Sequence, residues 1–272
     1  MKILIIGASG MIAQQTIKEL SKAGNELRLF SRGIKSENYP THEVTPGDVL
    51  KKSDLENAIT GCDAIHITIN TPDEALAVQN IVSIAKMKNI KRISYVSGAT
   101  VCKENSWFSM VGNKYKAEQL LKSSGIPYMI FRPTWFMESL DMMIQNGKAN
   151  VMGKQPLKIH WISAKDFAKQ LSKAYAIKES LNKEFYSYGP EKFTLKEALE
   201  QYIKVKHANI KKVSNVPFGL LKFIAFITEN KELKNIIPMF EYFDKTKEVG
   251  SSYNTNRLLG QPTITLSDWL IQ

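Results

Sequence analysis

The stretch MKILIIGASGMIA occupies residues 1–13 and holds a short apolar run that leads straight into a glycine. Gly7, Gly10 and Ala13 form a G-x-x-G-x-x-A pattern at the start of an expected helix. The first glycine permits a tight turn, the second lets backbone amides approach a pyrophosphate at the helix N-terminus, and the alanine lets the helix pack closely on a sheet. The stretch therefore predicts a strand, a phosphate-binding loop and a helix. The expected cofactor contacts in this loop are Gly7, Ser9, Gly10, Met11 and Ile12.

Strand-like and helix-like apolar patterns alternate after this stretch. The expected strands lie at 2–6, 26–30, 63–68, 92–96 and 128–131, and the expected longer helices at 13–20, 74–88 and 114–122. Parallel strands need crossover connections, so this alternation predicts an α/β fold in which helices cover both faces of a doubly wound parallel sheet of Rossmann type.

The pattern becomes less regular beyond about residue 150. The expected elements there are strands near 157–162 and 185–188 and helices near 164–176 and after Thr194. Thr194-x-x-Glu197 has the form of a capping box, which opens a helix. We therefore expect a dinucleotide-binding domain over 1–152 and a smaller, mostly helical substrate lobe over 153–272, with 157–188 returning elements to the first domain.

The second expected strand ends at Phe30-Ser31-Arg32, where a site selective for NAD usually carries an acidic residue that binds the ribose hydroxyls. Ser31 can donate a hydrogen bond to a phosphate, and Arg32 can hold one through its fork of donors. The sequence therefore predicts NADP as the cofactor, with NADPH preferred over NADH. The alternative is that Arg32 is an ordinary exposed loop residue.

Several short motifs together resemble the atypical short-chain dehydrogenase/reductases, and within them the NmrA-like, NAD(P)H-binding group. Besides the glycine loop and Ser31-Arg32, they are Gly47-Asp48, Gly61-Cys62-Asp63-Ala64, Tyr95-Val96-Ser97-Gly98, Lys114-Tyr115-Lys116-Ala117-Glu118, Ser124-Gly125-Ile126-Pro127-Tyr128, the run from Phe131 to Glu138, Asp166, Gly189-Pro190-Glu191 and Leu259-Gly260-Gln261-Pro262. The resemblance covers nearly the whole chain. It implies that Asp48 and Val49 lie near the adenine, that Ile69, Asn70 and Thr71 line the adenosine half, and that Pro133 and Trp135 approach the nicotinamide.

The resemblance also exposes a departure at the catalytic position. Typical members carry Tyr-x-x-x-Lys, in which the lysine binds the nicotinamide ribose and lowers the pKa of the tyrosine. Lys114 matches the lysine, but Met110 stands where the tyrosine is expected, and Tyr115 points to another side of the helix, roughly 100° away. Ser97 is expected to polarise a carbonyl. The alternatives are a helical ion pair of Lys114 with Glu118 and a Ser97 that simply ends a strand.

Aromatic and methionine side chains supply the candidates for a substrate pocket. The expected pocket residues are Trp107, Phe136, Met137 and His160. Clusters of this kind also form ordinary core, and a single histidine without an identifiable partner is more often structural than catalytic. The four histidines and two cysteines show no metal-ligand spacing, so no metal site is expected.

Charge and hydropathy give the expected partners. The net charge is +11, but the lysines are scattered and form no basic stripe, so no nucleic-acid partner is expected. No apolar run approaches the length of a membrane span, and the longest, Val216–Thr228, is expected to be core of the small lobe, with a membrane-surface or dimer helix as the alternatives. The expected protein is cytoplasmic, binds a small-molecule substrate, touches no membrane and is a monomer or homodimer.

Three functions fit these residues. The sequence favours an enzyme, an NADPH-dependent oxidoreductase that reduces a small carbonyl or quinone-like compound without the usual tyrosine. A non-catalytic NADP(H)-binding redox sensor of the NmrA-like type is the alternative, because it explains Met110 directly. A nucleotide-sugar epimerase ranks third, since that chemistry normally depends on the tyrosine.

Overall fold

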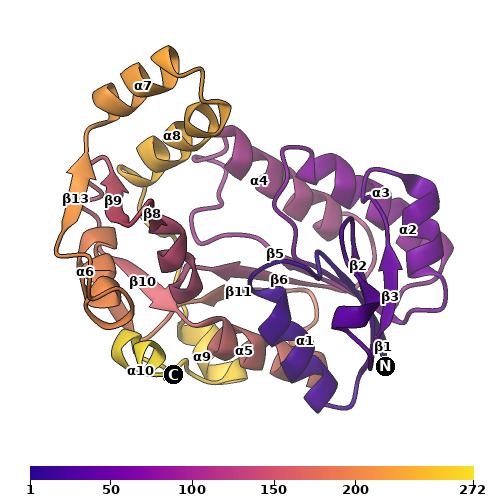
Figure 1. Ribbon diagram of the computed structural model, residues 1–272. Helices are drawn as coiled ribbons and strands as arrows, with labels where there is room; N and C mark the ends of the chain where they lie inside the picture. Colours follow the sequence, from indigo (N-terminus) through magenta and orange to yellow (C-terminus); the bar gives the residue numbers. More distant parts are fainter. The chain divides into compact units, whose positions relative to one another are not determined.

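The computed structural model describes residues 1–272, which form two compact units; Figure 1 colours the chain along its sequence. The first unit consists of Met1–Pro133, Ala164–Ser187 and Gly250–Gln261, and the second of Thr134–Ser163, Tyr188–Val249 and Pro262–Gln272. Each unit is therefore assembled from three separate stretches. The chain leaves the first unit at Pro133, ahead of the expected boundary at 152, and returns to it twice.

The first unit is built on a seven-stranded sheet of order β11-β6-β5-β4-β1-β2-β3, in which every neighbouring pair is parallel. Its strands are β1 (Lys2–Ile6), β2 (Glu26–Ser31), β3 (Glu43–Pro46), β4 (Ala64–Ile67), β5 (Arg92–Val96), β6 (Tyr128–Pro133) and β11 (Lys183–Ser187). The strand order reverses at β1, which pairs with β2 on one side and β4 on the other. The expected doubly wound fold of Rossmann type is confirmed, and sheets of this kind bind ligands outside the carboxyl ends of the strands at such a reversal.

Helices cover both faces of this sheet, as Figure 1 shows. They are α1 (Ala13–Lys22), α2 (Lys52–Ile59), α3 (Glu74–Met87), α4 (Ser109–Lys122), α5 (Ala164–Ala176) and α9 (Tyr253–Leu259). On one face α1 and α9 pack against α5, and on the other α2 and α4 pack against α3. The buried positions of α1 recur at helical spacing, so one side of this helix enters the core.

The second unit combines helices with two small three-stranded sheets of order β12-β10-β7 and β13-β9-β8. Its strands are β7 (Trp135–Phe136), β8 (Ile144–Gln145), β9 (Lys148–Met152), β10 (Ile159–Ile162), β12 (Glu191–Phe193) and β13 (Val213–Val216), and its helices are α6 (Leu195–Lys206), α7 (Phe218–Ile227), α8 (Lys231–Phe243) and α10 (Leu266–Leu270). Short 3-10 segments lie at Ser36–Asn38, Met137–Met143 and Lys178–Ser180. The expected capping box opens α6: the Thr194 hydroxyl accepts from the Glu197 N–H at 3.1 Å, and the Glu197 carboxylate accepts from the Thr194 N–H at 2.8 Å.

The apolar helix α7 differs from its expected role. Within the run Val216–Thr228, which was expected to be core of the small lobe, Leu220, Phe223, Ile224 and Ile227 recur on one side of the helix, and all four side chains are exposed. The expectation is wrong because helical periodicity identifies an apolar side but not what covers it; only Leu221 and Ala225 of this helix are buried. None of the helices combines the length and the apolar character that crossing a membrane requires.

Candidate dinucleotide-binding site

The turn after β1 can be made only by glycine at position 7. Gly7 has a φ of +89°, and a Cβ at this position would lie 2.1 Å from the carbonyl oxygen of Thr68. The Gly7 N–H donates to the carbonyl oxygen of Phe30 at 2.9 Å, which fixes the turn to β2. A side chain here would therefore clash with the strand next to β1 as well as strain the backbone. Glycine is required at position 7 because the ends of β1, β2 and β4 approach one another closely there.

The N-terminus of α1 is left open to an anion. Its N-cap residue, Ile12, offers no side-chain cap, and the first turn carries no acidic residue. Ser9, Gly10 and Met11 in front of it are exposed, whereas Ala13 is fully buried against the sheet. Free amides at a helix N-terminus and the positive end of its dipole favour a phosphate group. The loop thus fits a dinucleotide pyrophosphate.

The end of β2 carries hydrogen-bond donors, Ser31 and Arg32, and no acidic residue. The Ser31 hydroxyl is buried and has no hydrogen-bond partner, and the Arg32 side chain is exposed and makes no ion pair. The carboxylate of Glu43 lies opposite Arg28, at the other end of the β2–β3 pair, and is bound by Lys2 at 2.7 Å and Arg28 at 2.8 Å. Nothing in this part of the first unit neutralises Arg32. An orphaned hydroxyl beside an unpaired guanidinium fits an additional phosphate.

The loop after β3 is held by its own hydrogen bonds. The Asp48 N–H donates to Asp54 Oδ2 at 3.0 Å, and Asp48 Oδ1 accepts from the Leu50 N–H at 2.9 Å. A Cβ on Gly47 would lie 2.5 Å from the Phe30 ring, so glycine is needed for this approach to β2. Val49 packs against the core. Asp48 is therefore held in place by the Asp54 side chain and the Leu50 backbone.

The segment after β4 follows Thr68, whose carbonyl oxygen lies against Gly7. Ile69 packs on the core, Asn70 is exposed and Thr71 is half-buried. The Thr71 carbonyl oxygen accepts from the Glu74 N–H at 3.1 Å at the start of α3. The residues expected to line the adenosine half thus follow the strand next to the glycine turn.

Lys114 of α4 is bound to a buried carboxylate from another helix. Its Nζ lies 2.8 Å from Glu74 Oε1, and the Tyr95 hydroxyl donates to the same oxygen at 2.6 Å. Burial, and after it the charge of Glu74, raises the pKa of Tyr95 well above its ordinary value. The alternative ion pair of Lys114 with Glu118 is wrong, because Glu118 is engaged elsewhere. The phenol of Tyr95 is a poor acid in this setting, and Tyr115 lies on the outer side of α4, in a groove with Ala75 and Leu76.

Ser97 at the end of β5 donates its hydroxyl proton to Glu118 Oε1 at 2.6 Å. Glu118 is fully buried and also accepts from Arg132 Nε at 2.9 Å and Arg132 Nη2 at 2.5 Å. Arg132 in turn contacts Glu184 at 2.7 Å. A hydroxyl whose proton is held by a carboxylate cannot donate it to a substrate carbonyl at the same time. Pro133 ends β6 in this region, and its carbonyl oxygen accepts from the Ala99 N–H at 2.9 Å.

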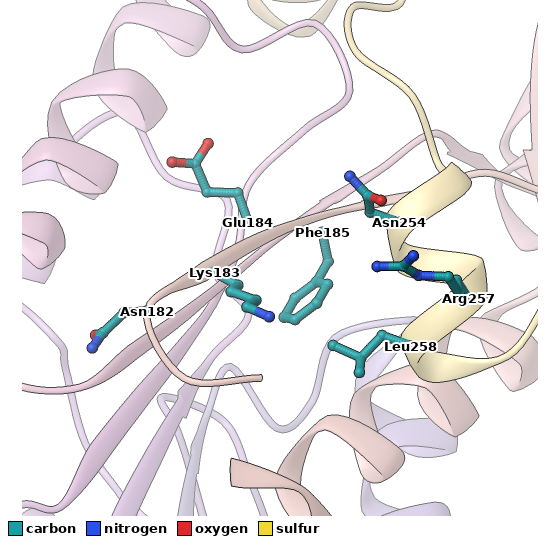
Figure 2. A pocket seen from close by; sticks show the side chains of 7 residues that line it. All are labelled: Asn182, Lys183, Glu184, Phe185, Asn254, Arg257 and Leu258. Atoms are coloured by element: carbon teal, nitrogen blue, oxygen red, sulfur yellow. The ribbon is translucent and has the colours of Figure 1, made fainter. Parts of the chain in front are cut away.

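A cavity of the first unit lies at the start of β11, beside α9 (Figure 2). Its volume is about 530 Å³, and its lining residues are Asn182, Lys183, Glu184, Phe185, Asn254, Arg257 and Leu258. All strands of this sheet run in the same direction. The amino-terminal end of β11 and the carboxyl-terminal end of β1 therefore lie at opposite ends of the strands. This cavity is therefore separate from the glycine loop.

Comparison with known proteins bears on this geometry. The sequence profile of the NAD(P)H-binding family matches residues 7–176, which is more than half of the chain. The chain belongs to this family. Its match begins at the glycine whose conformation and contacts make the phosphate turn, and it extends through α5.

Relatives within and around the family differ in their described roles. The photosystem II assembly factor Ycf39 of Trieres chinensis is 21% identical over 246 residues, covering 84% of this chain and 76% of that protein. The triphenylmethane reductase of Citrobacter sp., complexed with NADP(H), superposes with a TM-score of 0.79 at 18% identity, covering 100% of this chain and 99% of that one. The NADPH-dependent quinone oxidoreductase QOR2 of Escherichia coli, complexed with NADPH, gives 0.77 at 19% identity, covering 99% and 98%. At these identities the structural likeness shows the fold alone.

The remaining expected site residues of this family member fall into both units. Trp107 belongs to the first unit and is 71% exposed. Phe136, Met137 and His160 belong to the second unit, as does Trp135. Met137 is fully buried in the core of that unit, and Trp135 packs edge-on against Trp161 with ring centres 5.8 Å apart.

His160 has a partner that the sequence did not reveal. Its Nδ1 lies 2.7 Å from Glu248 Oε2, and its ring stacks on Tyr188 at a centroid distance of 4.6 Å. The other Glu248 oxygen accepts from the His160 N–H at 3.1 Å and from the Thr134 hydroxyl. The carboxylate therefore fixes the imidazole orientation. The pair spans 88 residues of sequence, and no local pattern at Glu248 indicates it.

Proposed function

We propose that the chain is an NADPH-dependent reductase whose preferred acceptors are small quinone-like compounds, with small carbonyl compounds as the second class. The observation that carries this proposal is the lack of a positioned acid around α4. Met110 replaces the family tyrosine, Lys114 is bound to Glu74, and the proton of Ser97 is directed at Glu118. Hydride acceptors that take their proton from solvent suit such a site.

Different residues of the chain bind different parts of NADPH in this proposal. When bound, NADPH supplies a hydride from its nicotinamide C4. The amides after Gly7 and the N-terminus of α1 hold the pyrophosphate, while Ser31 and Arg32 receive the 2′-phosphate and favour NADPH over NADH. The acceptor gains the hydride and one proton from water, so that a quinone becomes a hydroquinone and the dinucleotide becomes NADP⁺. A carbonyl acceptor needs a positioned proton donor, which is why small carbonyl compounds rank second.

The missing acid also supports a second function, a redox sensor that binds NADP(H) without turning it over. An epimerase ranks third, because that reaction needs the tyrosine that Met110 replaces. We keep the cytoplasm as the proposed location, since both cysteines are free thiols, and a small molecule as the proposed partner in place of nucleic acid.

Oxidation of NADPH, followed with a panel of quinones and aldehydes, tests the proposal. The parent protein should reduce quinones faster than aldehydes. Gly10→Asp is the matched control, because a Cβ there meets only the Gly7 carbonyl oxygen, at 3.2 Å, while its carboxylate repels the pyrophosphate at the positive end of α1. This variant should fold, bind no NADPH and show no turnover. Tight NADPH binding by the parent without turnover of any acceptor would overturn the reductase in favour of the sensor.

A further inference from the structure

Helix α7 exposes five of its eight apolar side chains. Its sequence from Phe218 to Ile227 is FGLLKFIAFI, which contains a single charge. The exposed fractions are 50% for Leu220, 61% for Phe223, 39% for Ile224, 76% for Phe226 and 62% for Ile227. Scattered exposed apolar residues are normal on a protein surface, but five on ten consecutive residues form a continuous patch, which marks an interaction surface.

The exposed residues form one whole side of the helix. At about 100° per residue, they cover an arc of roughly 160° from Phe226 through Phe223 and Ile227 to Ile224. Leu221 and Ala225 lie on the opposite side and pack against Ile237 of α8. The two helices thus form a hairpin whose inner side is core and whose outer side is apolar. A helix that is apolar all round is normally covered on both sides.

The charges around this helix are predominantly positive. Lys222, the only charge of α7, lies at the edge of the apolar side and pairs with Glu241 at 2.6 Å. Residues 211–247 contain seven lysines and four acidic residues, so their net charge is 7 − 4 = +3. Two of the four acids are engaged, Glu241 by Lys222 and Asp244 by the backbone N–H groups of Lys154 and Gln155. Four exposed lysines outside α7 have no acidic partner: Lys211 and Lys212 precede β13, and Lys231 and Lys234 lie in the first turn of α8, next to the exposed Glu229 and Glu232.

We propose that this side of α7 docks on the surface of an anionic phospholipid bilayer. Its apolar side chains enter the boundary between headgroups and acyl chains, and these four lysines contact the headgroups. Stable attachment of a peripheral protein generally requires two signals, a buried apolar surface and attraction to anionic lipid, and this part of the chain supplies both. The helix lies in the plane of the surface, because ten residues are too short to span it.

The net charge favours this occupant over a second copy of the chain. Self-association through α7 would bring together two chains that each carry a net charge of +11, which oppose one another. An anionic bilayer instead uses both features, the exposed apolar side and the excess of lysine. The expectation of no membrane contact rested on α7 being core, and its exposed side removes that support. The proposal is independent of the reductase function.

Flotation of the full chain with lipid vesicles tests the apolar contribution. Vesicles of phosphatidylcholine mixed with phosphatidylglycerol should carry the protein, and vesicles of phosphatidylcholine alone should carry much less. The double variant Phe223→Glu/Phe226→Glu should lower vesicle affinity at least tenfold, because each phenylalanine loses its favourable transfer from water. Val205→Glu is the matched control: Val205 is an exposed apolar residue of α6 in the same unit, and its replacement should leave affinity unchanged.

A second pair of variants tests the charge contribution. Lys231→Gln/Lys234→Gln should weaken binding to the mixed vesicles by roughly tenfold at low salt, and added salt should weaken the parent in the same way. Far-ultraviolet circular dichroism, which reports both units, shows for every variant whether the fold is intact. Failure of the parent to bind the mixed vesicles, or full binding by Phe223→Glu/Phe226→Glu, would overturn the proposal. A concentration-dependent dimer that this double variant dissociates, with no vesicle binding, would assign the surface to a second copy instead.

Discussion

Arg32 stands after β2 with an exposed guanidinium, next to a serine whose buried hydroxyl has no partner. If this pair receives the 2′-phosphate, Arg32→Ala should remove most of a preference for NADPH over NADH that we expect to be at least tenfold. A charge-assisted hydrogen bond to phosphate is worth about 1.5–3 kcal/mol, which corresponds to this range. Titration calorimetry with both dinucleotides measures it, and Lys35→Ala, another exposed cation of the same loop, is the control. Equal affinities of the parent protein for the two dinucleotides would reverse the assignment.

His66 of β4 couples the stability of the first unit to pH. It is fully buried, its Nδ1 lies 2.8 Å from Ser94 Oγ, and its Nε2 has no partner. Burial lowers its pKa from 6.5 to about 3. The folded protein therefore holds His66 neutral at pH values where the unfolded chain binds a proton. Its contribution to stability is complete above about pH 6.5, falls as the pH drops towards 3, and is constant below that.

The measurable consequence is a loss of about 2–3 kcal/mol in the free energy of unfolding between about pH 7.5 and about pH 4.5. Other groups also titrate in this interval, so the informative quantity is the difference between parent and variant. His66→Asn should be less stable at neutral pH because it leaves a cavity, but should lack this part of the acid-induced loss. Urea titrations at both pH values measure it. An unchanged pH dependence in the variant would show that His66 does not carry the effect.

At the scale of elements, the sequence indicated those that are long and regular. The apolar runs of β1, β4, β5 and β6 and the periodic helices between them were predicted, because burial on both faces of a parallel sheet leaves a continuous apolar signature. β3 was missed, since Glu43–Pro46 is short, polar and ends in proline, and is recognisable only through its pairing with β2. The role of α7 was mistaken, because an apolar helix has the same pattern whether it is buried or exposed.

The candidate site shows the same limit in its side chains. The glycine turn could be predicted, since its chemistry lies within seven consecutive residues. The contacts that decide the acid-base chemistry could not, because Lys114 meets Glu74 across 40 residues and His160 meets Glu248 across 88. A residue type at a family position indicates which group is present, but its proton and charge depend on partners that only the fold brings together.

Helix α4 offers a direct test of the missing acid. Met110 lies one helical turn before Lys114, so Met110→Tyr places a phenol on the same side of the helix as the lysine. A positioned acid typically contributes about 10²–10⁴-fold, and we expect a gain of roughly 10² in aldehyde reduction, near the lower end, because Glu74 partly neutralises Lys114. Quinone reduction should hardly change. Met110→Phe, which has the ring without the hydroxyl, is the control for both substrate classes.

Ketone reduction by the parent protein, without the added tyrosine, would contradict this prediction. Rapid ketone reduction by the parent protein would mean that another group already donates the proton. His160→Asn and Glu248→Gln would then identify it, since the first removes the imidazole and the second weakens the carboxylate that orients it. Loss of ketone reduction in both variants, with quinone reduction retained, would assign the proton to this pair.

At the scale of the whole molecule, the two units are interleaved along the chain. The chain passes between them at Pro133, Ser163, Ser187, Val249 and Gln261, so neither unit is a continuous segment. A ligand that binds only the folded state stabilises it by RT ln(1 + [L]/Kd), which is about 2.7 kcal/mol at a hundred times Kd. The phosphate turn and α1 belong to the first unit. Whether this stabilisation reaches the second unit depends on whether the two unfold together.

We expect them to unfold together, because unfolding of either unit frees stretches whose ends are anchored in the other. Trp107 lies in the first unit, whereas Trp135, Trp161 and Trp269 lie in the second, so the fluorescence of a Trp107→Phe variant reports the second unit alone. NADPH at saturating concentration should raise the midpoint of this fluorescence transition as much as that of the far-ultraviolet circular dichroism, which reports both units. Gly10→Asp, which should not bind the dinucleotide, should show neither shift. A fluorescence transition that stays in place while the dichroism transition moves would mean that the second unit unfolds independently.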